Sequence, residues 1–101
     1  MEKKRMSALS EREKEYRSLR RFVRRCEKPA NAAARLVAAA LERELTPRQR
    51  QMVNMYYLEQ HSMREIADML EVNPSTVTRT LQIARAKLQA AMDYCGAQMR
   101  E

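Results

Sequence analysis

The chain has 101 residues, of which 45% are hydrophobic and 33% are charged, and its formal net charge is +7. This length fits one compact domain with appendages, and the composition is that of a globular rather than a disordered chain. A single glycine excludes the glycine-rich loops that cradle phosphates, and a single histidine argues against a proton shuttle or a metal site. We therefore expect a protein that is not an enzyme and holds no metal and no cofactor.

Helix-forming residues dominate the sequence, and the scarcity of glycine and proline argues against a sheet of many short strands. The sequence predicts an all-α fold, a small bundle of about five helices with a C-terminal helix-turn-helix. Apolar spacing places the helices at about 10–26, 30–44, 46–58, 62–70 and 74–95. Residues 1–44 are expected to form a basic segment of two helices, and residues 45–101 the helix-turn-helix domain with a C-terminal extension.

Several residues mark the predicted helix ends. Capping boxes are expected where Thr46 and Ser62 each precede a glutamine or glutamate by three residues, and Asn73 is an expected N-cap. The three prolines, Pro29, Pro47 and Pro74, are each expected at the first position of a helix, and Gly96 at the end of the last one.

The predicted core consists of apolar residues at helical spacing. Its expected members are Leu9, Tyr16, Leu19, Val23, Cys26, Leu36, Val37, Ala40, Leu41, Met52, Val53, Tyr56, Ile66, Ala67, Leu70, Val77, Leu81, Ala84, Leu88, Met92 and Cys95. The methionines at 52, 55, 63 and 69 are interpreted as core filler. His61 is expected to be structural or solvated, and the Tyr56-Tyr57 pair to pack in the core rather than to stack on bases.

The positive charge is concentrated at the N-terminus, since residues 1–28 hold 11 basic and 5 acidic side chains. Such a balance indicates an anionic partner, with nucleic acid ahead of a membrane surface. The first helix could contact DNA phosphates, RNA polymerase or an anionic membrane, or be a solvated face. Glutamates at 11, 13 and 15 weaken the membrane interpretation. No apolar run is long enough to span a membrane. We expect a cytoplasmic protein whose two cysteines are reduced thiols.

The last two expected helices are joined by the short turn Glu71-Val72-Asn73, which is the spacing of a helix-turn-helix. In that motif the second helix enters the major groove. On a helical wheel Ser75, Arg79 and Gln82 lie opposite the apolar stripe. Arginine can bind guanine, and glutamine can bind adenine, through two hydrogen bonds each. We therefore predict that these three residues contact bases of double-stranded DNA.

Five blocks of sequence carry a family resemblance: Leu45-Thr46-Pro47-Arg48-Gln49-Arg50, Tyr56-Tyr57-Leu58-Glu59, Ile66-Ala67-Asp68-Met69-Leu70, Ser75-Thr76-Val77 and Ala84-Arg85-Ala86-Lys87-Leu88. The stretch that contains them resembles region four of the bacterial sigma factors, which reads the minus-thirty-five promoter element. The resemblance implies that Ser75 and Arg79 meet bases. It also implies that Arg64, Thr76 and Thr78 lie near phosphates. We add Arg85 and Lys87, the cations of an acid-free stretch, as predicted phosphate contacts.

The sequence departs from the sigma pattern at two places. Glu71 occupies the turn position that glycine usually fills, and it must adopt a conformation that favours glycine. Residues 1–44 are too short for the sigma domains that melt the promoter and bind the polymerase clamp. The chain is therefore similar to the small sigma-like regulators of phages and bacterial mobile elements.

The sequence predicts a DNA-binding regulator of transcription that reads the major groove with helix 74–95. The alternative is an interaction module that binds RNA polymerase or a sigma partner without reading DNA. The neutral charge of residues 62–101 supports this alternative, because they hold 5 basic and 5 acidic side chains. A homodimer formed through the extension after residue 90 is a further hypothesis, since many helix-turn-helix proteins bind as dimers.

Overall fold

The computed structural model describes residues 10–99, with side chains as far as Tyr94. The described residues form five α-helices and no strand: α2 (Glu11–Glu27), α3 (Ala32–Glu44), α4 (Pro47–Val53), α5 (Met63–Leu70) and α6 (Pro74–Met99). A π-helical turn, η1 (Asn54–Leu58), continues α4. The predicted all-α fold is thus confirmed. Predicted core residues Leu9 and Cys95 lie outside the residues whose side chains are described.

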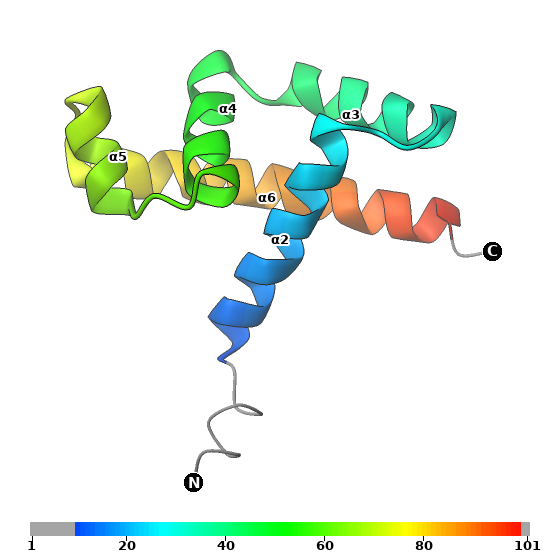
Figure 1. Cartoon of the computed structure of the whole chain (residues 1–101), viewed down its shortest axis with the longest axis horizontal. Coiled ribbons are helices and arrows are strands. Elements are labelled where there is room, and N and C mark those ends of the chain that lie inside the picture. Colours follow the sequence, from blue (N-terminus) through cyan, green and yellow to red (C-terminus); the bar gives the residue numbers. More distant parts are fainter. Residues whose placement is uncertain (1–9, 100–101) are drawn as a thin grey trace, which may run out of the picture.

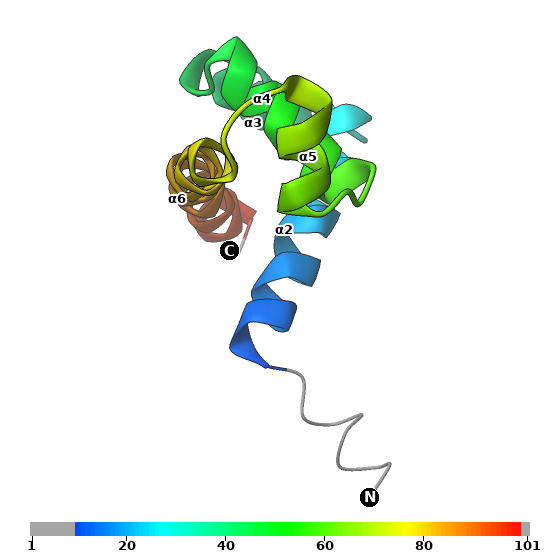
Figure 2. The same ribbon diagram turned by 90° about the vertical axis from the view of Figure 1, so that its left-hand side faces the viewer.

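Helix α6 is the central helix of the fold and contacts each of the other four α-helices. It runs along the long axis of the molecule, with α3 and α4 on one side and α2 crossing it (Figure 1). Seen along its axis, α6 stands apart on one side, and α4, α5 and α2 surround its inner face (Figure 2). One surface of α6 therefore faces away from the other helices.

The core is a single cluster to which all five α-helices and η1 contribute. Val77, Leu81, Ala84 and Leu88 recur every three or four residues along α6, so they form one buried stripe. This stripe packs with Leu19 of α2 and with buried residues of α4 and α5. The two N-terminal helices thus share one core with the helix-turn-helix.

Capping interactions determine where the helices begin. Thr46 and Ser62 form the two predicted capping boxes, and Ser10 forms a third that begins α2. Pro47 and Pro74 are the first residues of α4 and α6, as predicted. Pro29 is not the first residue of a helix, because Asn31 accepts the N–H of Ala34 at 2.8 Å and α3 begins after it.

Helix α3 buries a different face from the one predicted. Leu36 is 74% exposed and Ala40 is exposed, whereas Leu41 is buried and Val37 is half-buried, as expected. Alanine occupies positions all around this helix, so the apolar pattern of its sequence does not define which side faces the core. The prediction was wrong for Leu36 and Ala40.

The π-helical turn changes which residues of the third predicted helix are buried. Met55 and Tyr57 are buried, whereas Tyr56, expected inside, is half-buried. A π turn takes one more residue than an α turn, so the side chains within it rotate away from the α-helical phase. Met69 on α5 is 54% exposed, and its interpretation as core filler was wrong.

Helix α6 extends beyond its predicted end. Gly96 was expected to end it, but the helix continues to Met99. No helix among residues 10–99 is long and apolar enough to cross a membrane.

Candidate nucleic-acid interface

The turn between α5 and α6 is a left-handed helix end. Glu71 has φ 56° and ψ 47°. Its N–H donates to the carbonyl of Asp68 at 3.3 Å, and the N–H of Val72 donates to the carbonyl of Ala67 at 2.9 Å. These bonds form a Schellman motif, in which glycine usually occupies the left-handed position. The short turn expected at residues 71–73 is formed, with a glutamate in a conformation that costs about 1 kcal/mol.

Asn73 begins α6 as its predicted cap. Its carbonyl accepts the N–H of Thr76 at 2.9 Å, and its Oδ1 lies 3.3 Å from the Ser75 hydroxyl. A serine hydroxyl that donates to Asn73 keeps its lone pairs for accepting a hydrogen bond. Ser75 is exposed in the first turn of α6, so it can accept from a base donor without giving up this contact.

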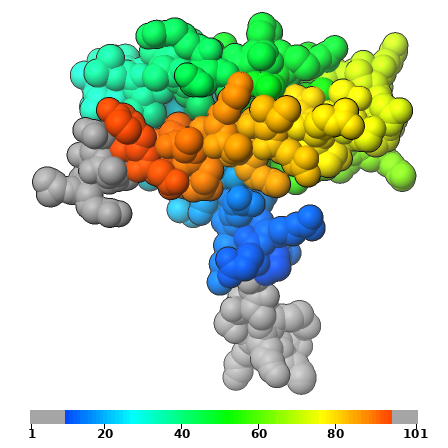
Figure 3. All heavy atoms as spheres, turned by 180° about the vertical axis from the view of Figure 1, so that it is seen from behind, coloured from blue at the N-terminus to red at the C-terminus, as the bar shows by residue number. Residues whose placement is uncertain are grey.

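Arg79 and Gln82 lie on the side of α6 that faces away from the core. Both side chains are exposed, and neither has a hydrogen bond or ion pair within residues 10–99. Figure 3 shows α6, in yellow and orange, extending across this face of the molecule. The structure thus brings the three predicted base-contacting residues together within two turns of one exposed helix.

The predicted phosphate contacts differ in what surrounds them. Arg64 is exposed on α5 and has no partner among the described residues. The Thr78 hydroxyl donates to the carbonyl of Pro74 at 3.2 Å and lies 3.6 Å from the sulfur of Met63 at the start of α5. Thr76 is half-buried. Arg64, Thr76 and Thr78 therefore come from the N-terminal turns of α5 and α6, the two helices of the motif.

Arg85 and Lys87 face other helices. The Arg85 Nε lies 3.9 Å from the carboxylate of Glu15 on α2. The Lys87 Nζ donates to the carbonyl of Glu44 at 2.7 Å and to the Oε1 of Gln49 at 3.1 Å. Lys87 therefore connects α6 to the end of α3 and the start of α4, and its ammonium is already bonded within the protein.

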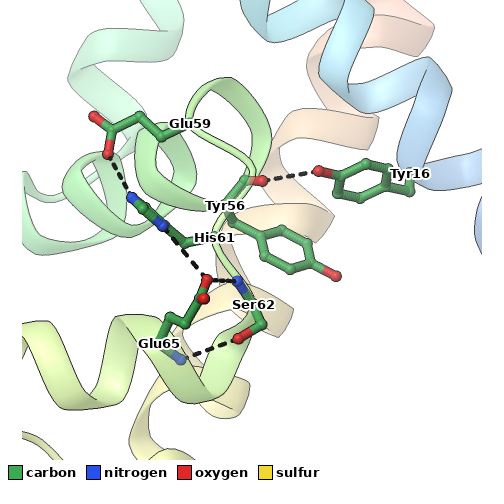
Figure 4. A network of polar contacts seen from close by, with 6 residues as sticks. All are labelled: Tyr16, Tyr56, Glu59, His61, Ser62 and Glu65. Carbon is green, nitrogen blue, oxygen red and sulfur yellow. Dashed lines mark hydrogen bonds and ion pairs between the residues drawn. The ribbon is translucent and has the colours of Figure 1, made fainter.

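His61 belongs to a surface network at the start of α5 (Figure 4). Its Nε2 lies 3.2 Å from Glu59 and its Nδ1 lies 3.5 Å from Glu65. The Glu65 carboxylate also accepts the backbone N–H of Ser62 at 2.9 Å. This backbone hydrogen bond, with the nearby His61, holds the pKa of Glu65 below its usual value. The structural role expected for His61 agrees with this geometry.

The tyrosines of the chain's central region are packed against α2. The Tyr16 hydroxyl donates to the carbonyl of Tyr56 at 2.9 Å, and the rings of Tyr16 and Tyr57 stack with centroids 5.2 Å apart. Burial raises the pKa of Tyr57 well above its usual value and also raises that of Tyr56. Tyr57 is 2% exposed and belongs to the core, as predicted, so it has no free ring face for a base, whereas Tyr56 is half-buried and packs against the core.

One exposed apolar residue on α6 was not identified from the sequence as part of the site. Ile83 is 47% exposed and lies beside Gln82 and one turn after Arg79. The helical periodicity of the sequence could have identified Ile83, because it lies outside the buried stripe of α6 and is therefore expected on the surface.

The residues described in the structure contain no group of three or more histidines, cysteines, aspartates or glutamates that could hold a metal ion.

Helices α5 and α6 are joined by a capped turn, and α6, the second of the two, has a polar, exposed face. That arrangement defines a helix-turn-helix protein. The chain matches the family model of sigma-70 region 4 over residues 33–88, more than half of its length, and it belongs to this family. The domain is thus a DNA-binding helix-turn-helix of the sigma type.

Sigma region 4 domains bind DNA and RNA polymerase. The matched stretch runs from α3 to the middle of α6, so it leaves α2 outside. Comparisons with curated proteins and with solved structures gave no match.

Proposed function

We propose that this protein is a sequence-specific regulator of transcription that reads the major groove of double-stranded DNA with α6 and catalyses no reaction. The observation that carries the proposal is the pair formed by Arg79 and Gln82. Both side chains project from the exposed face of α6 with no partner among the described residues. Each has the geometry to bind a purine through two hydrogen bonds.

The spacing along α6 supports direct readout of a short element. Ser75 and Gln82 are seven residues apart in one helix, so their Cα atoms are separated by about 10 Å along its axis. This distance corresponds to about three base-pair steps. Ile83, beside Gln82, offers an apolar surface of the kind that contacts thymine methyl groups. One helix therefore supplies both polar and apolar contacts to successive base pairs.

The flanking residues support contacts with the phosphate backbone. Arg64 has no partner among the described residues. The hydroxyls of Thr76 and Thr78 lie in the first two turns of α6, and that of Thr78 would exchange its 3.2 Å hydrogen bond to the Pro74 carbonyl for a phosphate. We include Arg85 as a contact that would exchange its 3.9 Å ion pair with Glu15 for a phosphate. Lys87 is left out, because a phosphate contact would require it to abandon two hydrogen bonds within the protein.

The test is a selection of binding sites from random duplexes, made with the wild-type chain and with Arg79→Ala. We expect an enriched motif, and a loss of preference at one base position in the variant worth about 1–3 kcal/mol. Arg43→Ala is the matched control, since Arg43 is exposed on α3 and its loss changes the net charge equally. A motif identical in Arg79→Ala and in the control would contradict readout by Arg79, and the absence of any motif would contradict the function.

A second function is favoured by the charges of α5. Glu65 and Asp68 on α5 and Glu71 at its C-cap are exposed, and α5 carries only Arg64 as a cation. This acidic surface repels phosphate but suits a basic protein surface, and RNA polymerase is a partner of region 4 domains. If the selection yields no motif, binding of purified RNA polymerase to the wild-type chain and to Asp68→Lys distinguishes this alternative.

A further inference from the structure

Helix α2 carries a cationic face that the helix-turn-helix does not use. Its members are Arg17, Arg20, Arg21, Arg24, Arg25 and Lys28, which we call the arginine face. They recur at helical spacing opposite the buried Leu19, Phe22 and Val23. All but Arg20 are exposed, and the six side chains line one open groove on the surface of α2. Arg17 and Arg20 also line a second groove that reaches the start of α5.

These cations are not neutralised within the described part of the chain. None of the six has an ion pair with a described carboxylate. Glu11 and Glu13 are in the first turn of α2, Glu15 faces Arg85, and Glu27, the last residue of the helix, is exposed without an ion pair among the described residues and lines a pocket with α3. From residue 17 to its end at residue 27 the helix rises by about 15 Å, and Lys28 follows as its C-cap. So many like charges over that distance repel one another and do not stabilise the fold. An external anion is therefore the natural partner.

The chemistry of the arginine face favours phosphates of nucleic acid over an acidic protein. Stable protein interfaces have an apolar centre, whereas this face has only cations. Interfaces with nucleic acid are polar and strongly positive, and the arginine fork binds phosphate through two parallel hydrogen bonds. A lipid surface fits less well, because a membrane-bound helix inserts an apolar face and that of α2 is buried in the core.

The arginine face and the exposed face of α6 are on opposite sides of the molecule. In Figure 1 helix α2 passes in front of α6, and in Figure 3, seen from behind, α6 covers most of the C-terminal half of α2. Each helix directs its buried stripe to the shared core. The outward faces therefore point away from each other.

We propose that the arginine face of α2 is a second nucleic-acid site, which binds phosphates without regard to sequence and independently of α6. Such a site would hold a stretch of nucleic acid other than the one read by α6. The family match does not cover this helix, so the site is a property of this chain's own N-terminal segment.

The test measures how the affinity of the full chain for a random-sequence duplex depends on salt. The variant replaces Arg21, Arg24 and Arg25 with alanine, and all three are exposed, so the fold is retained. The matched control replaces Arg35, Arg43 and Arg48 with alanine. These three arginines are exposed and lie outside both surfaces, and their replacement removes the same charge. Circular dichroism and the melting temperature verify that both proteins are folded.

We expect the α2 variant to reduce the steepness of the negative slope of log affinity against log salt by about 2 to 3, since each phosphate contact contributes about −0.9. The control should lower it by less than half as much. The same change should occur in the Arg79→Ala background, because independent sites are additive. If the salt dependence of the α2 variant equals that of the control, the proposal is overturned, and an acidic protein becomes the expected partner of the arginine face. Failure of the site selection would not affect this result, so the two proposals fail separately.

Discussion

The ammonium of Lys87 and the side-chain oxygen of Gln49 form a 3.1 Å hydrogen bond that joins α6 to the start of α4. The same oxygen accepts the backbone N–H of Thr46 at 3.0 Å, and Lys87 also donates to the carbonyl of Glu44 at 2.7 Å. That carbonyl belongs to the last turn of α3, where helix carbonyls have no partner within the helix. One lysine thus satisfies the end of one helix and supports the cap of the next.

This arrangement predicts that Lys87 is needed for stability. Lys87→Met keeps an apolar stem of similar length but loses both hydrogen bonds, which should lower the free energy of unfolding by about 1 kcal/mol. For a domain of this size the melting temperature should fall by about 4–8 °C. Arg79→Met is the control, because Arg79 has no partner among the described residues and its loss should leave the melting temperature unchanged. Equal melting temperatures for the two variants would contradict the structural role of Lys87.

The left-handed conformation of Glu71 predicts a stabilising substitution. With φ at 56°, glutamate is in a region that glycine occupies without steric cost. Glu71→Gly should raise the free energy of unfolding by about 0.5–1 kcal/mol, measured by the midpoint of urea denaturation. Glu71→Ala removes the same charge but keeps the Cβ atom, so it should give no such gain. A gain of equal size in both variants would assign the effect to charge instead of backbone conformation.

The helix starts of this protein could be predicted from sequence because they depend on local contacts. The side chains of Thr46, Ser62 and Asn73 accept hydrogen bonds from backbone N–H groups two or three residues away. The buried stripe of α6 could be predicted for a similar reason, since its residues contrast with the polar ones between them. The candidate base contacts follow from that stripe, as they lie on the opposite side of the same helix.

Other features depend on contacts between distant parts of the chain. The π turn at 54–58 packs its tyrosines against Tyr16, and nothing in the local sequence indicates the extra residue. Lys87, which the sequence predicts to contact phosphate, donates within the protein to a carbonyl 43 residues away and to the side chain of Gln49. A charge pattern shows how many cations a helix carries, but it does not show which of them form hydrogen bonds or ion pairs within the protein.

The contact between Tyr16 and η1 predicts a stability effect without loss of packing. Tyr16→Phe keeps the ring that stacks on Tyr57 but leaves the carbonyl of Tyr56 without the hydroxyl that donates to it at 2.9 Å. The free energy of unfolding should fall by about 1 kcal/mol in urea titrations. Tyr94→Phe, which alters a tyrosine that is 62% exposed, should have no effect. If Tyr16→Phe is as stable as Tyr94→Phe, the hydrogen bond does not hold α2 on η1.

The capping carboxylate of Glu65 predicts how stability depends on pH. The backbone N–H of Ser62, aided by His61, holds the pKa of Glu65 below its usual 4.5, so its contribution to stability is complete above that pH. As the pH falls through the lowered pKa, the carboxylate is protonated in the folded state and the contribution is lost. Glu65→Gln keeps a capping oxygen that does not titrate. The melting temperature of the wild-type chain should exceed that of the variant near neutral pH, and the difference should shrink as the pH falls below 4.5.

A second substitution separates this effect from the general loss of acidic charge. Asp68→Asn changes an exposed carboxylate of the same helix whose side chain makes no hydrogen bond among the described residues. The difference in melting temperature between the wild-type chain and this variant should be smaller near neutral pH than the difference measured for Glu65→Gln. A gap between wild type and Glu65→Gln that stays constant or widens on acidification would show that the ionised carboxylate does not stabilise the start of α5. The loss would then have to come from another feature of the glutamate side chain.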